Sequence, residues 1–375
     1  MNILYISKLL GCPSAGPTYS IPAQVSAQSK IDNVFWYNLA TTAESNWKES
    51  LQNIKNHEPT YHDLDDYPEG KINRLPVPFC NPDIIVVEQM YKYATLGIRK
   101  ELIRNSFPFV LIPRGELTDD AQRQKSIKKI IFNRLIFFKF SNAATAIQYL
   151  TSQEESNSSN KWNKSSIVIP NGTIIPETNA DRRTGCKKGI NMVFIGRINK
   201  YHKGLDLLLE AAAQVRDSLT QNNCRIKVYG PDDLNQVSEL ISFCRNNELE
   251  EIVSFEGPVV GKEKTSVLQE SDVFLMPSRF EGHPTGLLEA LAYGLPCVAT
   301  TGSNMRKEIE LADAGWTADN DAESIKNALL SMISDKDKFM EKGRNARNLA
   351  KEYDWNAIAR KTHDVYENLL RGNMG

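Results

Sequence analysis

The stretch of residues 272–300, DVFLMPSRFEGHPTGLLEALAYGLPCVAT, constrains the fold of this chain more than any other. Its first five residues predict a short buried strand and residues 277–284 a loop, followed by a helix that Thr285 can cap. Gly294 stands where a helix end needs a left-handed residue, and residues 297–300 predict the next strand. A strand, loop, helix and strand in this order form one unit of a parallel sheet. Open α/β sheets bind ligands at the carboxyl end of such strands.

Two carboxylates, Glu281 in the loop and Glu289 on the helix, lie on either side of the predicted helix N-terminus. That end of a helix has a positive dipole and unpaired N–H groups, so it suits a phosphate, while the carboxylates could accept sugar hydroxyls. The residues expected to line the phosphate seat are Gly282, His283, Thr285, Gly286 and Leu287. The pattern indicates a cradle for a nucleotide sugar. The alternative is that both glutamates are solvated charges on an ordinary crossover helix.

The same residues resemble a known family. The run E-G-H-P-T-G-L-L-E resembles the E-x7-E signature of retaining glycosyltransferases of the GT-B fold, family four, and the flanking P-S-R-F-E-G and L-E-A-L-A-Y-G-L-P are similar as well. The resemblance implies an α/β protein with two Rossmann-like parallel-sheet domains that face each other across a cleft. It also implies transfer of a sugar from a nucleotide diphosphate donor to an acceptor hydroxyl, with retained configuration.

A second motif follows the predicted strand at residues 191–195. Gly196 and Arg197 precede Lys203 in a G-R-x5-K-G-x-D pattern that is similar to the diphosphate clamp of this family. Negative charge grows on a departing diphosphate, so two cations aimed there bind the transition state more tightly than the ground state. An arginine offers a planar fork and a lysine a point charge. The alternative is a pair of surface charges, and His202 is expected to face solvent.

The resemblance also implies roles for individual residues. Glu281 would orient the donor sugar, Glu289 would bind the ribose, and main-chain groups near Pro258 and Val259 would hold a base of the UDP or GDP type. A loop near the amino terminus would touch the donor, which makes Gly16 a candidate, although an ordinary turn is an equal alternative. No metal cofactor is expected, because Arg197 and Lys203 would replace it.

Residues 113–117, Pro-Arg-Gly-Glu-Leu, follow a predicted strand at residues 109–112. Some members of the resembling family have a histidine at the second position, on the acceptor side of the cleft. This chain has Arg114, so no histidine role transfers. Arg114 could hold an acceptor phosphate or hydroxyl, or it could pair with Glu116.

Residues 122–140 form a basic segment in which apolar residues recur at helical spacing. One interpretation is a surface that rests on anionic lipid, where a lipid-linked acceptor would be found. The alternative is a helix with a buried apolar face and a solvated basic face. The cations expected at the membrane are Arg123, Lys125, Lys128 and Lys129.

A chain of 375 residues is too long for one ordinary core and suits two domains. The boundaries expected from the sequence are residues 1–175 for an acceptor-side domain and residues 185–352 for a nucleotide-sugar domain. A final helix in residues 355–375 is expected to cross back to the first domain. The net charge of −1 provides no field for nucleic acid.

The first residues predict a strand and not a signal peptide, no apolar run reaches about 18 residues, and the cysteines form no C-x-x-C pair. The sequence therefore predicts a cytoplasmic enzyme, at the inner face of the membrane if the basic segment binds lipid, in cell-surface polysaccharide or glycolipid synthesis. Two alternatives are a non-hydrolysing nucleotide-sugar epimerase and a non-catalytic subunit that binds nucleotide or membrane.

Overall fold

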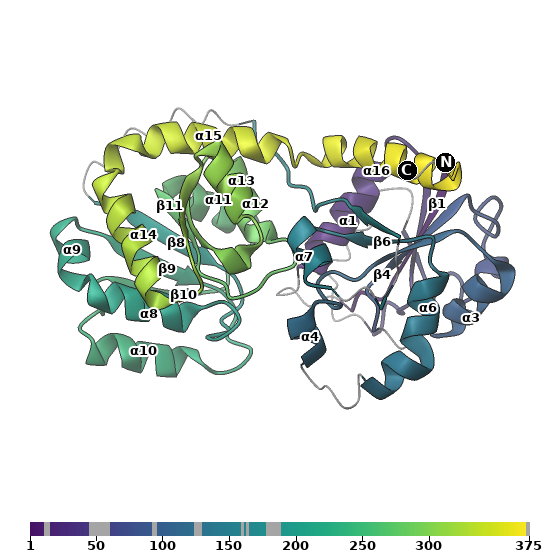
Figure 1. The fold of residues 1–375 in the computed structure, drawn as a ribbon, viewed down its shortest axis with the longest axis horizontal. Coiled ribbons are helices and arrows are strands. Elements are labelled where there is room, and N and C mark those ends of the chain that lie inside the picture. Colours follow the sequence, from purple (N-terminus) through teal and green to yellow (C-terminus); the bar gives the residue numbers. More distant parts are fainter. Residues whose placement is uncertain are drawn as a thin grey trace. The chain divides into compact units, whose positions relative to one another are not determined.

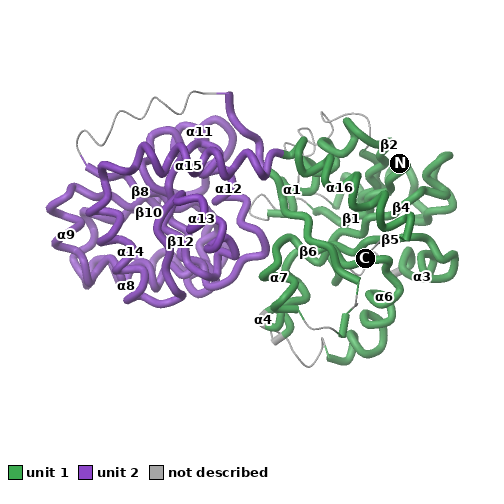
Figure 2. Tube along the Cα trace, turned by 45° about the horizontal axis from the view of Figure 1, so that its top comes forward, with its two compact units in different colours: residues 1–172, 355–375 green, residues 173–354 purple. Residues whose placement is uncertain are grey.

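The computed structural model describes residues 1–10, 16–44, 61–91, 96–123, 130–158, 161–162, 165–177 and 189–372. The chain divides into two compact units (Figure 2). Unit 1 comprises residues 1–172 and 355–375, and unit 2 comprises residues 173–354. Each unit is built around its own parallel sheet, so each is described by itself.

Unit 1 contains a seven-stranded sheet of strand order β3-β2-β1-β4-β5-β6-β7, in which all described pairings are parallel. Its strands are β1 Asn2–Ser7, β2 Asn33–Asn38, β3 Tyr61–Asp63, β4 Ile84–Glu88, β5 Phe109–Ile112, β6 Ala146–Tyr149 and β7 Ser166–Val168. Its helices are α1 Pro17–Gln28, α3 Leu96–Asn105, α4 Asp119–Arg123, α6 Phe138–Ala143, α7 Ser152–Ser156 and α16 Trp355–Leu370, with a π-helical turn at Asn133–Phe137.

Both faces of this sheet are buried. Helices α1 and α16 cover one face, with Trp355 and Tyr366 of α16 in the apolar cluster that they share with β1 and β4 (Figure 1). Helices α3 and α6 cover the other face. Parallel strands buried on two sides read as continuous apolar runs, and Ile84–Glu88, with the sequence IIVVE, is such a run.

Unit 2 contains a six-stranded parallel sheet of order β10-β9-β8-β11-β12-β13. Its strands are β8 Asn191–Ile195, β9 Arg225–Tyr229, β10 Val253–Gly257, β11 Val273–Met276, β12 Cys297–Thr300 and β13 Gly315–Ala318. Its helices are α8 Leu205–Gln214, α9 Arg216–Gln221, α10 Val237–Asn246, α11 Gly261–Glu270, α12 Thr285–Ala292, α13 Arg306–Ala312, α14 Ala322–Ser334 and α15 Phe339–Lys351.

The order of the strands in unit 2 defines where a ligand can enter. Strand β8 lies in the middle, with β9 on one side and β11 on the other. The chain proceeds from β8 outward in one direction and then returns to start again at β11, so the sheet has a topological switch point between β8 and β11. Helices α8, α10 and α14 pack on one face and α11, α12, α13 and α15 on the other (Figure 1). Open α/β sheets bind ligands outside the carboxyl ends of the strands at such a switch point.

The predicted α/β class with two parallel sheets is confirmed. Some local predictions differ from the structure. Pro284, and not Thr285, precedes α12, and no side chain caps this helix. Helix α8 ends at Gln214, and α9 follows it from Arg216. No helix in the described ranges combines the length and the apolar character that crossing a bilayer requires.

Candidate functional site

The switch point brings the two sequence motifs together. The loop after β8 contains Lys203, and the loop after β11 contains Glu281, 78 residues further along the chain. Because β8 and β11 are hydrogen-bonded neighbours, both loops begin at the same edge of the sheet. The Lys203 Nζ and Glu281 Oε1 atoms form an ion pair of 2.6 Å, and the two side chains are only 15% and 10% exposed.

The charge of Glu281 is stabilised locally. Burial by itself raises the pKa of this carboxyl, but the charge of Lys203 and the hydrogen bonds from Lys203 and Ser278 lower it, so the pKa lies below its usual value. The Ser278 hydroxyl donates to the same Oε1 atom over 2.6 Å. Glu281 is therefore an ionised, partly desolvated acceptor that Lys203 and Ser278 hold in one orientation.

The prediction that His202 faces solvent is wrong. Its ring stacks on Phe280 with centroids 4.2 Å apart, and Nε2 donates to the Phe280 carbonyl over 2.7 Å. Burial lowers the pKa of His202, and the positive charges of Lys203 and Arg197 lower it further against the opposing effect of Glu281. The imidazole is thus neutral near pH 7 and joins the two loops.

Arg197 lies close enough to His202 for its charge to affect that imidazole. Its side chain is exposed and makes no hydrogen bond or ion pair with any residue that the structure describes, although its charge reaches His202. An exposed guanidinium beside a buried ion pair can bind an incoming anion without first breaking an internal contact. Gly196, the residue before it, would place a Cβ 3.0 Å from the Phe194 ring, so the backbone here approaches the core closely.

Gly204 explains how Lys203 reaches this position. Its φ of +63° lies in the left-handed region, and a Cβ at this position would be 1.9 Å from the carbonyl oxygen of Pro277. The loop after β8 therefore touches the loop after β11 backbone to backbone, which only glycine permits. This contact sets the separation of the two motifs.

The N-terminus of α12 differs in part from the prediction. The amides of Gly282, Thr285 and Gly286 donate to no residue in the described ranges, as a phosphate seat requires. The amide of Leu287 does not belong to this group, because it donates to the Pro284 carbonyl over 3.0 Å. Three unpaired amides at a helix N-terminus still provide a site for an anion.

Three predicted donor-binding residues remain: Glu289 lies on α12, and Pro258 and Val259 follow β10. Glu289, on α12, forms an ion pair with Lys264 of α11, and both side chains are about one-third exposed. Val259 is buried and Pro258 is exposed, directly after β10. Lys264 is not predicted from the sequence, where its only signal is its place in the first turn of α11.

His283 lies two residues before the start of α12. It is buried, its ring lies 5.4 Å from that of Tyr353, and burial lowers its pKa to about 3. The unfolded chain, with a histidine pKa near 6.5, binds this proton more readily than the folded chain, so acidification favours unfolding.

We expect His283 to make the unfolding free energy fall as the pH drops from about 6.5 toward 3, by up to about 1.4 kcal/mol per pH unit. Urea unfolding of wild type and His283→Phe across this range measures it. The difference between the two proteins should follow that slope. Parallel curves for wild type and His283→Phe would contradict the assignment.

In unit 1, the hydrogen-bond partners of Arg114 differ from those that the sequence predicts. Arg114 does not pair with Glu116, and it offers nothing to an acceptor, because all five of its N–H groups are used inside unit 1. It binds Glu88 through two nitrogens at 2.7 and 3.1 Å, and the remaining hydrogens go to neutral oxygens. Those further partners are Ser20 at 3.1 Å, Asn171 at 3.0 Å and Gln24 at 2.8 Å.

Gly16 precedes α1, is exposed, and has open space where a Cβ would be. Residues 124–129 of the predicted basic segment, which include Lys125, Lys128 and Lys129, lie outside the described residues, and so does the side chain of Arg123. The residues that follow expose large apolar side chains, namely Ile130, Ile131, Phe132 and Leu135.

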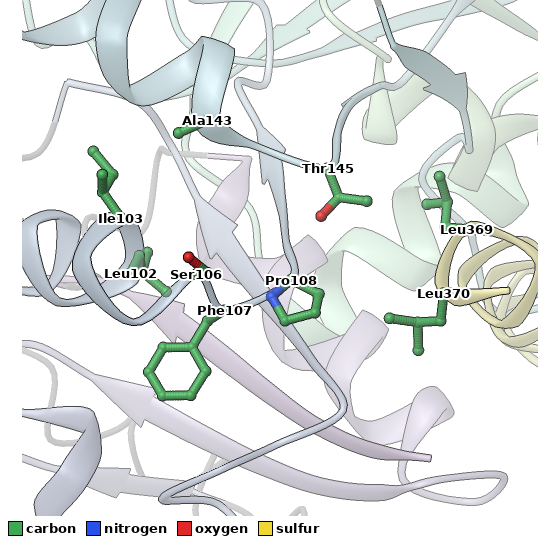
Figure 3. A pocket seen from close by; sticks show the side chains of 9 residues that line it. All are labelled: Leu102, Ile103, Ser106, Phe107, Pro108, Ala143, Thr145, Leu369 and Leu370. Carbon is green, nitrogen blue, oxygen red and sulfur yellow. The ribbon is translucent and has the colours of Figure 1, made fainter. Parts of the chain in front are cut away.

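A cavity of about 410 Å³ lies in unit 1, between Leu102 of α3, Ala143 of α6 and Leu369 of α16 (Figure 3). Pro108 and Thr145, which also line it, directly precede β5 and β6. The cavity is therefore at the amino-terminal edge of its sheet, opposite the edge where α/β sheets bind ligands. Within the described ranges, no group of three or more histidine, cysteine or carboxylate side chains could hold a metal ion.

Comparisons with known proteins agree with this arrangement. Residues 189–335 match the family described as glycosyl transferases group 1. A curated relative, the D-inositol 3-phosphate glycosyltransferase of Corynebacterium kroppenstedtii, is 28% identical over 184 residues, which are 48% of this chain and 41% of that protein. The chain thus spans less than half the length of the first curated relatives that it matches.

Solved structures resemble the whole chain. Anabaena Alr3699/HepE, in complex with UDP, has a TM-score of 0.76 at 16% identity, with 98% of this chain and 100% of that chain covered. WaaG, a glycosyltransferase involved in lipopolysaccharide biosynthesis, has a TM-score of 0.63 at 16% identity, with coverage of 97% and 99%. At such identities these likenesses show the fold.

The chain therefore has the GT-B fold, with two parallel-sheet α/β domains. More particularly, the match to the glycosyl transferases group 1 family lies within unit 2, where the two motifs meet.

Proposed function

We propose that this protein is a retaining glycosyltransferase that moves a sugar from a nucleoside diphosphate sugar to an acceptor hydroxyl. The observation that supports it most is the meeting of Lys203 and Glu281 at the switch point of unit 2, beside the unpaired amides that begin α12. Cations, a hydrogen-bond acceptor and helix-end amides are what a sugar joined to a diphosphate needs.

In the proposed reaction the bond between the anomeric carbon and the diphosphate oxygen breaks, and the acceptor oxygen forms the new bond on the same face. Arg197 and Lys203 bind the diphosphate, whose negative charge grows as the bond breaks. The leaving phosphate helps to take the acceptor proton. Glu281, held by Lys203 and Ser278, accepts a hydroxyl of the donor sugar and orients it.

The nucleoside end of the donor is proposed to lie along α11 and α12. Glu289 accepts the ribose hydroxyls, and backbone groups at Pro258 and Val259 hold a uracil or guanine base. Alr3699/HepE was solved with UDP, which supports a nucleotide of this kind. No metal is assigned a role, because Arg197 and Lys203 supply the positive charge at the diphosphate.

The acceptor is proposed to be a saccharide or a lipid-linked saccharide of the cell surface, as the names of WaaG and the inositol phosphate glycosyltransferase suggest. The exposed apolar side chains of Ile130, Ile131 and Leu135 follow the basic residues of the same segment. Such a combination supports binding to an anionic membrane surface by an enzyme on the cytoplasmic side.

A flotation assay tests the membrane proposal. The protein should float with vesicles that contain about one-third anionic phospholipid and stay behind with neutral vesicles, and added salt should release it. A variant with Lys125, Lys128 and Lys129 replaced by glutamine should lose flotation. Absence of binding at low salt would remove this part of the proposal.

The central proposal is tested with nucleotides. UDP or GDP should raise the melting temperature of the protein, because a ligand that binds only the folded state stabilises it. The matching nucleotide sugars should then be turned over, with the nucleoside diphosphate released. NMR of the donor without acceptor distinguishes the epimerase alternative, which would give an epimer, and failure of every nucleotide to bind would contradict the proposal.

We expect Glu289→Gln to weaken binding of the preferred nucleoside diphosphate about 10-fold or more. A hydrogen bond to a charged acceptor contributes about 1.5–3 kcal/mol, and the substitution removes the charge and retains the shape. Isothermal titration calorimetry measures the affinity. Glu323→Gln, at an exposed ion pair with Lys326 on α14, is the control and should bind as wild type does. Equal affinities for wild type and Glu289→Gln would contradict the ribose role.

A further inference from the structure

The loop between β11 and α12 has an unusual pattern of hydrogen bonds. Five consecutive backbone carbonyls in it, those of residues 278–282, accept hydrogen bonds from side chains elsewhere in unit 2. Thr300 Oγ1 donates to the Ser278 carbonyl over 2.6 Å, and Asn320 Nδ2 donates to the Arg279 carbonyl over 3.2 Å. His202 Nε2 donates to the Phe280 carbonyl over 2.7 Å. Asn304 Nδ2 donates to the Glu281 carbonyl and also, over 3.2 Å, to the Gly282 carbonyl.

These donors come from three other loops at the same edge of the sheet. His202 follows β8, Thr300 and Asn304 lie at the end of β12 and just after it, and Asn320 follows β13. Surface loops usually leave their carbonyls to water, because the chain offers no regular partner. In this loop side chains replace the water, so the orientation of each peptide plane is fixed before any ligand arrives.

Packing reinforces the same loop. A Cβ on Gly302 would lie 2.2 Å from the Arg279 carbonyl oxygen and 2.3 Å from that of Ser278, so the turn after β12 lies directly against the loop. The Gly302 amide donates to Asn320 Oδ1 over 2.9 Å, which orients the carboxamide that binds Arg279. Asn320, one of the donors to the loop, is therefore itself held in place.

Asn304 has the most direct connection to the anion site. A trans peptide is planar, so the N–H of a residue points away from the carbonyl of the residue before it. By holding the carbonyls of Glu281 and Gly282, Asn304 turns the amides of Gly282 and His283 to the opposite side of the loop. The Gly282 amide is one of those that donate to no described residue.

Asn304 has a backbone conformation that suits this task. Its φ is +58°, in the left-handed region, which asparagine and glycine adopt more readily than other residues. This conformation also makes a clean substitution possible, because glycine at position 304 removes the carboxamide without straining the backbone.

We propose that Asn304 is a positioning residue for the diphosphate of the donor: it holds the Glu281 carbonyl so that the amide of Gly282 is aimed at the anion. The proposal rests on the proposed function, since it assumes that a diphosphate binds at the start of α12. It adds a residue outside both sequence motifs to the machinery that stabilises the departing diphosphate.

The test compares Asn304→Gly with Asn223→Gly. Asn223 is a second asparagine of unit 2 with a left-handed φ of +50°, but it directly precedes Cys224 and β9, at the opposite edge of the sheet. The same substitution in the same conformation therefore serves as the control. Titration calorimetry with UDP and GDP should give an affinity about tenfold weaker for Asn304→Gly and an unchanged affinity for Asn223→Gly.

A kinetic measurement separates positioning from a general loss of structure. On the nucleotide sugar that wild type turns over, Asn304→Gly should lower kcat by a larger factor than it raises KM, because the amides face more charge in the transition state than in the bound donor. Loss of folding would instead lower the active fraction, and the melting temperatures of both glycine variants would report it.

The outcomes are distinguishable. If wild type binds UDP or GDP and Asn304→Gly binds and turns over equally well, the inference is overturned and the donor site stands. If Asn223→Gly shows the same loss as Asn304→Gly, the effect is one of stability and the inference is overturned as well. If wild type binds neither nucleotide, the proposed donor site fails and the inference fails with it.

Discussion

Replacing Lys203 by methionine should lower kcat by about 10²–10³-fold while the affinity for the nucleoside diphosphate falls by much less. Removing one donor that faces developing negative charge has an effect of this size in other enzymes. Lys203 also neutralises Glu281, so the variant loses both a cation for the leaving group and the partner of the carboxylate that orients the sugar. Steady-state kinetics on the preferred nucleotide sugar and calorimetry on its diphosphate measure the two effects separately.

The control is Lys200→Met, three residues earlier in the same loop. Lys200 pairs with Glu239 at 2.6 Å, and its side chain is more exposed than that of Lys203, so its loss should leave kcat unchanged. If Lys203→Met has the kcat of wild type, Lys203 has no electrostatic role in the reaction. Circular dichroism of all three proteins establishes that they are equally folded.

Replacing Arg114 by methionine should destabilise unit 1 by about 3–5 kcal/mol, because it leaves the carboxylate of Glu88 buried without a partner. The Arg114 and Glu88 side chains are 4% and 0% exposed, and the guanidinium uses every one of its hydrogens. Urea unfolding followed by hydrogen exchange of the β1 and β4 amides reports the stability of this unit in the full chain.

Two controls accompany this variant. Arg74→Met removes an arginine that is 62% exposed and pairs with Glu69, which is 47% exposed, and it should change stability by less than about 1 kcal/mol. Adding Glu88→Leu to Arg114→Met removes the orphaned carboxylate and should restore part of the loss. If Arg114→Met is as stable as wild type but loses acceptor binding, the arginine acts on the substrate and not on the fold.

Much of the fold could be predicted because parallel strands buried on both faces are uninterrupted apolar runs. Residues 273–276 and 297–300, with a left-handed glycine between them, are of this kind. Strand β3 was missed, since it has three residues, Tyr61–Asp63, in a polar and proline-rich region. Strand β13, Gly315–Ala318, was missed because it is a four-residue edge strand that includes Gly315 and Thr317.

Much of the arrangement of the candidate site could also be anticipated, for a different reason. Lys203 and Glu281 are far apart in the sequence, but each follows a strand, and adjacent parallel strands place their loops at one edge. The position of His202 could not be predicted, since its contact with Phe280 depends on the path of two loops. The partners of Arg114 come from three separate parts of unit 1, which no spacing rule relates.

The side chains that hold the carbonyls of residues 278–282 were not predicted at all. Hydrogen bonds from a side chain to a backbone depend on the direction of the peptide and not on the identity of the accepting residue. They produce no periodicity and no motif, so Thr300, Asn304 and Asn320 look like ordinary polar residues after strands. Such contacts are visible only in three dimensions.

The place of α16 in the chain has a consequence for the order of assembly during translation. Unit 2 is a single continuous segment, whereas unit 1 receives α16 only after unit 2 has been made. Until then the apolar surface that will cover Trp355 and Tyr366 lacks its helix, and Gln148 lacks the hydroxyl that donates to it over 2.7 Å. During translation unit 2 can therefore complete its fold first. Unit 1 is synthesised earlier, but the face that α16 covers stays exposed until α16 has been made.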